Sequence, residues 1–284
     1  NGTRKAPMNL KMTTTVQFPE GNAVLESQVS NPFIVITNEC QYEESDGSLL
    51  KRMSFGTAST ETSWVSFANQ LQRHFVRATR QDFSKPDRYL SARELAYIHE
   101  RFFGGRPFAA AAQFDAFWNW FGKALQKLRY TRHVCALWRE GLLWAFIERD
   151  EMNRLLAGQQ PGSFVVRLSE RHAGLFAIGY RADSSAGPDS VRHYLVKPEE
   201  ISMQKTLPDF LGEVHTFTNI IQIKFPDMTD TESQNAGVAT QATTPGPSFC
   251  IYPKDTALGQ YYSKREQRNV TGLSLIHISQ GIVR

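Results

Sequence analysis

A strand-like segment with an arginine at its centre is the feature that most constrains this chain. Residues 162–170 read Gly-Ser-Phe-Val-Val-Arg-Leu-Ser-Glu, so that Arg167 stands among four apolar side chains. A guanidinium stays ionised at neutral pH, and its burial is costly unless an anion meets it. The segment therefore predicts an anion beside Arg167, which is either part of a ligand or an internal carboxylate.

The residues around Arg167 suit a phosphate. Side chains two apart share one face of a strand, so Arg167 and Ser169 point the same way, and the amides of the turn 169–171 follow directly. A guanidinium, a hydroxyl and backbone amides together are typical of phosphate sites. Arg149, near the start of the preceding expected helix, is a second candidate cation. Spacing alone does not separate this interpretation from an internal ion pair or from an arginine that emerges at a sheet edge.

The composition sets wider bounds. The 284 residues are 41% apolar and 12% aromatic, which is enough for cores in two domains or in parts of three. A net charge of +4 permits contact with phosphate or nucleic acid without requiring it. The three cysteines are far apart and in no metal-ligand spacing, which favours free thiols in a reducing compartment. No apolar run is long enough to span a membrane, and no signal peptide is visible.

The two ends of the chain suggest a fragment. The sequence begins at Asn1, without a methionine, in what reads as strand and loop. Residues 269–284 continue none of the apolar periods that precede them. We expect a piece of a longer protein, with residues 269–284 as a candidate for non-native sequence.

Residues 1–56 favour strands. Residues 12–18 are β-branched and partly alternating and run into a turn at 19–22, and residues 32–37 form a stronger β run. So few strands cannot close a sheet. We therefore interpret residues 1–56 as the end of a larger β domain.

Helical periodicity takes over between residues 57 and 137. A first helix follows the candidate caps Ser59 and Thr60, and a second begins at Ser91, which forms a capping box with Glu94. Two further apolar stripes at helical spacing follow. No Pro- or Gly-rich linker separates these helices from the next module, so we expect a packed helical layer attached rigidly to it.

The segment from residue 138 to 268 mixes helices with strands. We expect a helix at 146–156, a meander of strands at 162–168, 175–180 and 190–196, and a helix at 207–214. Residues 226–249 are rich in Thr, Ser, Gln and Pro and read as a flexible insertion. This order predicts a central antiparallel sheet flanked by helices.

Four collinear segments resemble the STAT family of transcription factors. Residues 138–141 and 159–170 resemble the start and the arginine strand of its Src-homology-2 (SH2) domain. Residues 117–121, Phe-Trp-Asn-Trp-Phe, resemble its helical linker, and residues 32–38 resemble a strand of its DNA-binding domain.

The resemblance implies a multidomain α+β fold. Its parts would be the end of an Ig-like β-barrel DNA-binding domain (1–56), an all-α linker domain (57–137) and an SH2 domain (138–268).

The resemblance also assigns roles to site residues. Arg167 would grip a phosphotyrosine, and Arg149 stands where the family has a basic helix residue. Ser169 and Glu170 lie in the phosphate-loop motif. Arg171 stands where a serine is common, and it either adds charge or crowds the pocket. No metal and no cofactor is implied.

His193 and Asn38 carry two interpretations each, and the tyrosine pair 261–262 carries one. His193, in the third expected strand, either lines the phenol ring of the bound phosphotyrosine or is a structural histidine. Asn38 matches an asparagine that approaches DNA, or is a turn residue after a strand. Tyr261 and Tyr262 resemble the segment that closes the SH2 region, so we expect the phosphorylated tyrosine farther downstream and absent here.

Three classes of function compete. In a STAT-like transcription factor of cytoplasm and nucleus, the pocket captures a phosphotyrosine of a receptor or partner chain, reciprocal capture makes a homodimer, and the dimer binds DNA. The alternative is a phosphotyrosine-binding adaptor that does not contact DNA. An enzyme is the least favoured class, because the chain has no Gly-x-Ser-x-Gly, P-loop, kinase or metal-ligand motif.

Overall fold

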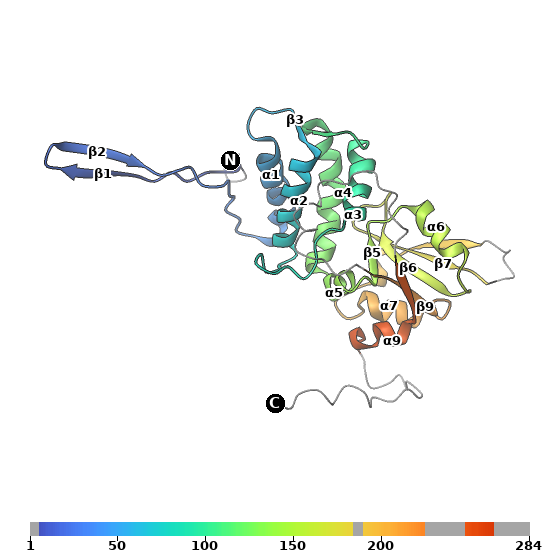
Figure 1. Cartoon of the computed structure of the whole chain (residues 1–284). Helices are drawn as coiled ribbons and strands as arrows, with labels where there is room; N and C mark the ends of the chain where they lie inside the picture. Colours follow the sequence, from blue (N-terminus) through green and yellow to red (C-terminus); the bar gives the residue numbers. More distant parts are fainter. Residues whose placement is uncertain (1–5, 184–189, 225–247, 264–284) are drawn as a thin grey trace, which may run out of the picture.

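The computed structural model describes residues 6–183, 190–224 and 248–263. Three parts follow one another along the chain in Figure 1: a protruding β-hairpin, a helical unit and a sheet unit with its own helices. The expected tail, residues 269–284, lies outside the described residues, as does most of the expected insertion. Phe249, the last residue of that insertion, begins a strand instead.

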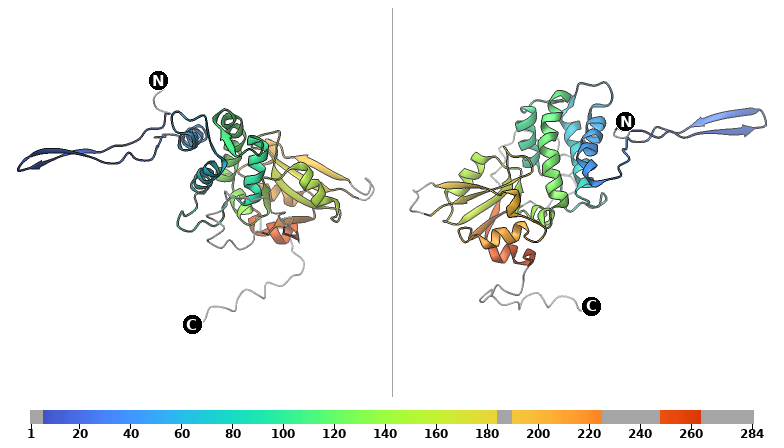
Figure 2. Two further views of the ribbon diagram at one scale, coloured as in Figure 1. Left: turned by 45° about the horizontal axis from the view of Figure 1, so that its top comes forward. Right: turned by 180° about the vertical axis from the view of Figure 1, so that it is seen from behind.

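The hairpin stands away from the rest of the molecule in all views (Figures 1 and 2). Strands β1 (Thr13–Phe18) and β2 (Gly21–Glu26) pair antiparallel around the expected turn, and neither contains a buried residue. The second expected β run contributes only a bridge between Met8 and Phe33. A two-stranded hairpin is at best marginally stable by itself in water. The described residues thus form no barrel, and the barrel domain stays a prediction.

The expectation of strands up to residue 56 is wrong for its last quarter. After a short 3-10 helix, η2 (Glu39–Gln41), residues Tyr42–Phe55 form helix α1. Leu50 and Phe55 are buried against the other helices, and Glu43 and Arg52 lie at the helix ends that favour their charges. Burial of this apolar face against α2 and α4 outweighs the weak local signals, because helical stability in proteins comes mostly from packing.

The helical unit packs around aromatic side chains. Its remaining elements are β3 (Glu61–Ser63), α2 (Trp64–Ala78), α3 (Ala92–Ile98), the π-helix η3 (His99–Phe103), β4 (Phe108–Ala110), α4 (Ala111–Tyr130) and α5 (Val134–Arg139). Phe67, Phe117 and Phe121 are fully buried within it. The capping box of Ser91 and Glu94 is confirmed, whereas α2 is capped by Ser63 rather than by the expected residues 59 and 60. The unit also contains a short pair, β3–β4, so it is not purely α-helical.

The sheet unit has helices on both faces, as expected. Among the described residues its sheet has the strand order β10-β9-β6-β7-β8, with β5 also paired to β6. Figure 1 shows α6 over one face and α7 with α9 under the other. The elements are β5 (Leu143–Ala145), α6 (Arg149–Ala157), β6 (Ser163–Leu168), β7 (Phe176–Arg181), β8 (Val191–Leu195), η5 (Pro198–Glu200), α7 (Leu207–Glu213), β9 (Asn219–Ile223), β10 (Phe249–Pro253), α9 (Lys254–Leu258) and η6 (Gly259–Tyr261).

The sheet differs from the expected antiparallel one in two pairings. The meander β6-β7-β8 is antiparallel, but both β5 and β9 run parallel to β6. Parallel pairs need a crossover connection, and α6 supplies it between β5 and β6. Strand β6 therefore lies inside a mixed sheet with every residue buried, which explains its nearly continuous apolar sequence.

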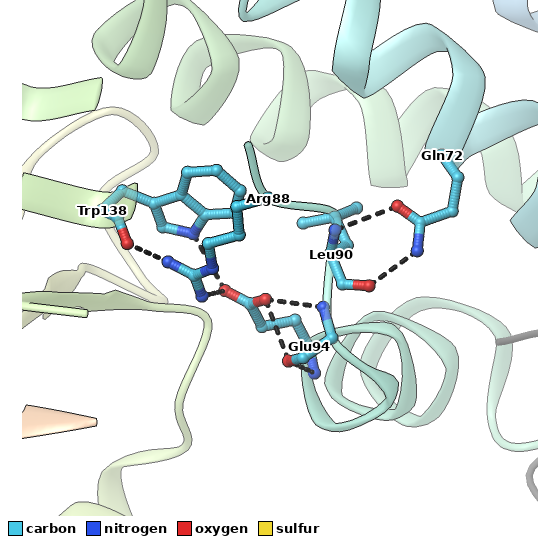
Figure 3. A network of polar contacts seen from close by, with 6 residues as sticks. Gln72, Arg88, Leu90, Glu94 and Trp138 are labelled. Carbon is cyan, nitrogen blue, oxygen red and sulfur yellow. Dashed lines mark hydrogen bonds and ion pairs between the residues drawn. The ribbon is translucent and has the colours of Figure 1, made fainter. Parts of the chain in front are cut away.

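A buried polar network fixes α5 to the loop that precedes α3 (Figure 3). The Arg88 guanidinium donates to the Trp138 carbonyl and, at 2.9 Å, to the Glu94 carboxylate. Trp138 Nε1 donates to the same carboxylate oxygen at 3.0 Å, and the Arg88 guanidinium lies 3.8 Å from the Trp138 ring centre. Because α5 leads directly into β5, the network holds the junction between the helical unit and the sheet unit.

Lys254 is expected to stabilise the C-terminal end of α7. Its buried Nζ donates to the carbonyls of Leu211, Gly212 and Val214 at 3.1, 3.0 and 2.7 Å. The change Lys254→Met keeps the length of the side chain but leaves these carbonyls without this donor, so we expect the free energy of unfolding to fall by about 2–3 kcal/mol. Denaturant unfolding measures this loss. The exposed Lys197→Met is the matched control, and an equal loss in both variants would contradict the assignment.

Candidate functional site

Arg167 occupies the middle of the sheet unit. It lies on β6 opposite Ala177 of β7, and only 6% of its side chain is exposed. Its Nη1 donates to the Leu168 carbonyl at 3.1 Å and to Glu170 Oε1 at 3.2 Å. Its Nε is buried and finds no hydrogen-bond partner among the residues that the structure describes. Burial lowers the pKa of the guanidinium from its ordinary value, and the charge of Glu170 opposes that shift.

The Glu170 carboxylate is the anion beside Arg167 in this structure. The same Oε1 also accepts the backbone N–H of Arg149, at 2.8 Å. Arg149 is the first residue of α6, which begins three residues after the expected helix start at 146, and its side chain is exposed. The internal ion pair that the sequence left open is therefore present, at the place that a ligand phosphate would need.

Ser169 begins the loop after β6 and is buried. Its hydroxyl accepts the backbone N–H of His172 at 3.1 Å, and its carbonyl accepts Trp120 Nε1 at 2.9 Å. Arg171, the next residue but one, is exposed. Arg171 therefore faces solvent, whereas the hydrogen bonds of Ser169 stabilise the conformation of the loop.

His193 lies on β8, opposite Gly179 of β7. Burial first, and then the charges of Arg149 and Arg167, lower the pKa of its imidazole to about 4. Its Nδ1 is buried without a hydrogen-bond partner in the described part of the chain. His193 is therefore neutral at pH 7 and close enough to both arginines to respond to their charge.

The other three candidates make their hydrogen bonds with residues outside this cluster. Asn38 is exposed and its side chain accepts the backbone N–H of Cys40 at 3.3 Å, which caps η2. Tyr261 donates to the Glu140 carboxylate at 2.5 Å, and Tyr262 donates to Asp255 at 2.6 Å. Both tyrosines are thus held within the fold.

The helical unit supplies two residues that the sequence did not indicate. Trp120 of α4 and Arg101 of η3 donate to the successive carbonyls of Ser169 and Glu170, at 2.9 and 2.7 Å. Both are distant in sequence from the loop, and no pattern in the chain links them to it. Only the packing of the two units reveals this contact.

The described residues contain no cluster of His, Cys, Asp or Glu suited to a metal ion. In the same part of the chain, no helix is both long and apolar enough to cross a membrane.

Two known families match parts of the chain. The family "SH2 domain" matches residues 143–223, which include β5 to β9 and hence Arg167. The family "EF-hand fold domain" matches residues 38–131, which include α1 to α4.

Curated relatives match nearly the whole chain. Signal transducer and activator of transcription A of Dictyostelium discoideum is 42% identical over 93% of this chain and 35% of the relative. Signal transducer and activator of transcription B of the same organism is 38% identical over 95% of this chain and 24% of the relative. Human signal transducer and activator of transcription 4 is 26% identical over 52% of this chain. The chain therefore spans about a third or less of the length of these relatives.

A solved structure, the inactive choanoflagellate E3 ubiquitin ligase Cbl TKB, aligns with 61% of this chain at 18% identity and a TM-score of 0.26, which is too low to support an argument. The alignments with the two Dictyostelium discoideum relatives cover more than nine tenths of this chain, and the SH2 domain match lies in the expected place. The chain belongs to the signal transducer and activator of transcription (STAT) family.

Proposed function

We propose that the sheet unit binds phosphotyrosine on another polypeptide, and that Arg167 is the principal contact. The observation that carries this is a buried guanidinium in the SH2 domain, whose Nε has no described partner and whose Nη1 already holds an anion. Arg149, Ser169 and Arg171 surround the phosphate, Glu170 belongs to the same loop, and His193 lies against the phenol ring. A phosphate dianion suits this set because charge-assisted hydrogen bonds to arginine are among the strongest in proteins.

The same site serves signal transduction. In this proposal the pocket recruits the chain to a phosphorylated receptor and then captures the phosphotyrosine of a second STAT-like chain, so that reciprocal capture makes a homodimer. The dimer binds DNA through the β region that begins with the hairpin and includes Asn38, and it regulates transcription after moving from cytoplasm to nucleus. We assign no enzymatic activity to it.

A peptide titration tests the binding proposal. The chain is titrated with a random-sequence phosphotyrosine peptide library, with the same library lacking phosphate, and with a phosphoserine library. We expect binding to the phosphotyrosine library alone, because the pocket needs both the dianion and the ring. Equal retention of the phosphorylated and unphosphorylated libraries would contradict the proposal.

DNA binding needs a separate test. The full-length protein, phosphorylated on tyrosine, is mixed with a random DNA library in a mobility-shift selection. Enrichment of a two-fold symmetric sequence is the expected result. Phosphotyrosine binding without any retained DNA would favour the adaptor alternative.

A further inference from the structure

Two hydrogen-bond donors and one ion-pair partner, from three separate segments, meet at the Glu170 carboxylate. Arg167 Nη1 of β6 donates to Oε1 at 3.2 Å, and the first backbone N–H of α6, that of Arg149, donates to it at 2.8 Å. Arg101 of the helical unit places its Nη1 3.8 Å from Oε2. The carboxylate thus lies between two guanidinium groups and a helix N-terminus, each of which favours an anion.

This arrangement is the one that a phosphate needs. The amide at the start of α6 and the Arg167 guanidinium are the donors that the proposed function assigns to a phosphotyrosine, and an anion already occupies both. Two anions that share these donors repel each other. A ligand phosphate must therefore displace the carboxylate of Glu170.

Arg101 is held where it would meet that phosphate. Its Nη2 donates to the Glu170 carbonyl at 2.7 Å, and its guanidinium lies 5.3 Å from the ring centre of Phe102 and 5.8 Å from that of Trp120. Because the carbonyl bond does not involve the carboxylate, Arg101 stays in place when the carboxylate swings away.

We propose that the helical unit contributes Arg101 to the phosphotyrosine site. In the unliganded protein the Glu170 carboxylate occupies the position of the phosphate, and the phosphate of the ligand displaces it. This inference rests on the proposed function. Arg101 is then a binding residue outside the SH2 domain, and Glu170 is an intramolecular competitor within it. Affinity for phosphotyrosine then depends on the contact between the helical unit and the loop after β6.

Two substitutions with opposite expected effects test this. Arg101→Gln removes a cation from the site, and we expect about tenfold weaker binding of a phosphotyrosine peptide selected from the library. Glu170→Gln removes the competing charge, and we expect about tenfold tighter binding. The effect of Arg101→Gln shrinks as salt is raised, because its source is a partly exposed charge. Arg101→Lys restores part of the loss, since it keeps the charge.

The control for Arg101 is Arg106→Gln, which removes an exposed cation from the same unit. Phenyl phosphate is titrated beside the peptide, so that effects on the phosphate site are separated from effects on flanking residues. Thermal unfolding of each variant checks the fold. If Arg101→Gln does not fold, the peptide affinities of Arg101→Lys and Glu170→Gln test the inference instead.

Two outcomes would overturn the inference. Weaker binding by Glu170→Gln would make Glu170 a residue that orients Arg167 rather than a competitor. Binding by Arg101→Gln that equals that of Arg106→Gln would remove Arg101 from the site. In both cases the proposed function stands if the parent chain binds the peptide and loses it on substitution of Arg167. If the parent chain binds no phosphotyrosine ligand, the proposed function itself fails.

Discussion

Replacing Arg167 by alanine is expected to abolish phosphotyrosine-peptide binding while the protein stays folded. The guanidinium is the most deeply buried cation of the site, so its bonds to a phosphate form away from water. Truncating one partner of such a buried charged pair costs about 2–5 kcal/mol or more, which is a loss of about thirtyfold to several thousandfold in affinity. Isothermal titration with the selected peptide measures the loss.

The fold should tolerate this change. Removal of a buried guanidinium also removes the cost of its desolvation. The partner carboxylate, Glu170, keeps the N–H of Arg149 and the nearby Arg101. Circular dichroism checks the fold, and Arg167→Met, which leaves a smaller cavity, is the second variant.

A matched control and a contrary outcome complete the test of Arg167. Arg192→Ala removes an exposed arginine from strand β8 of the same sheet, and we expect no more than a small change in affinity. If Arg167→Ala binds as tightly as the parent, or if both Arg167 variants unfold, the arginine serves only the internal ion pair with Glu170.

The second large effect is expected at Glu94. Its side chain is 1% exposed, and its two oxygens accept from Arg88, Trp138 and the backbone and hydroxyl of Ser91. The change Glu94→Gln replaces one of these oxygens with a donor and leaves Arg88 charged and buried. Breaking a buried pair in this way costs about 3–5 kcal/mol, which denaturant unfolding would show as a shifted midpoint.

Two further variants identify the cause. Glu100→Gln changes an exposed carboxylate in the same unit, and its midpoint should stay near that of the parent. In Arg88→Met/Glu94→Gln the buried guanidinium is removed together with the carboxylate, so we expect less destabilisation than the sum of the two single changes. A loss below about 1 kcal/mol for Glu94→Gln would contradict the role of this network in holding the junction.

Several elements follow from local chemistry in the sequence. The apolar run around Arg167 predicts a strand that is buried on both faces, and β6 is such a strand because other strands flank it. The capping box of Ser91 predicts the start of α3, because both of its hydrogen bonds form within one turn. The meander that follows Arg167 is equally local.

Other elements depend on partners that are distant in sequence. Residues 32–37 have a strong β propensity, but a strand needs a partner, and among the described residues only Phe33 finds one. Residues 42–55 carry little local helical signal, but their apolar side chains are buried against α2 and α4. The parallel pairing of β5 and β9 with β6 is a similar case. No short segment of the sequence specifies which strands pair in parallel after a crossover connection.

The candidate site divides in the same way. The sequence by itself determines that Arg167 needs an anion, since its charge and its apolar neighbours are properties of one strand. Only the tertiary structure decides which groups surround that anion. The N-terminus of α6 positions Arg149 beside the anion, and the turn after β6 positions Glu170. Packing of the helical unit against this turn positions Arg101. Electrostatic interactions act through space, so their partners are known only when the chain has been folded.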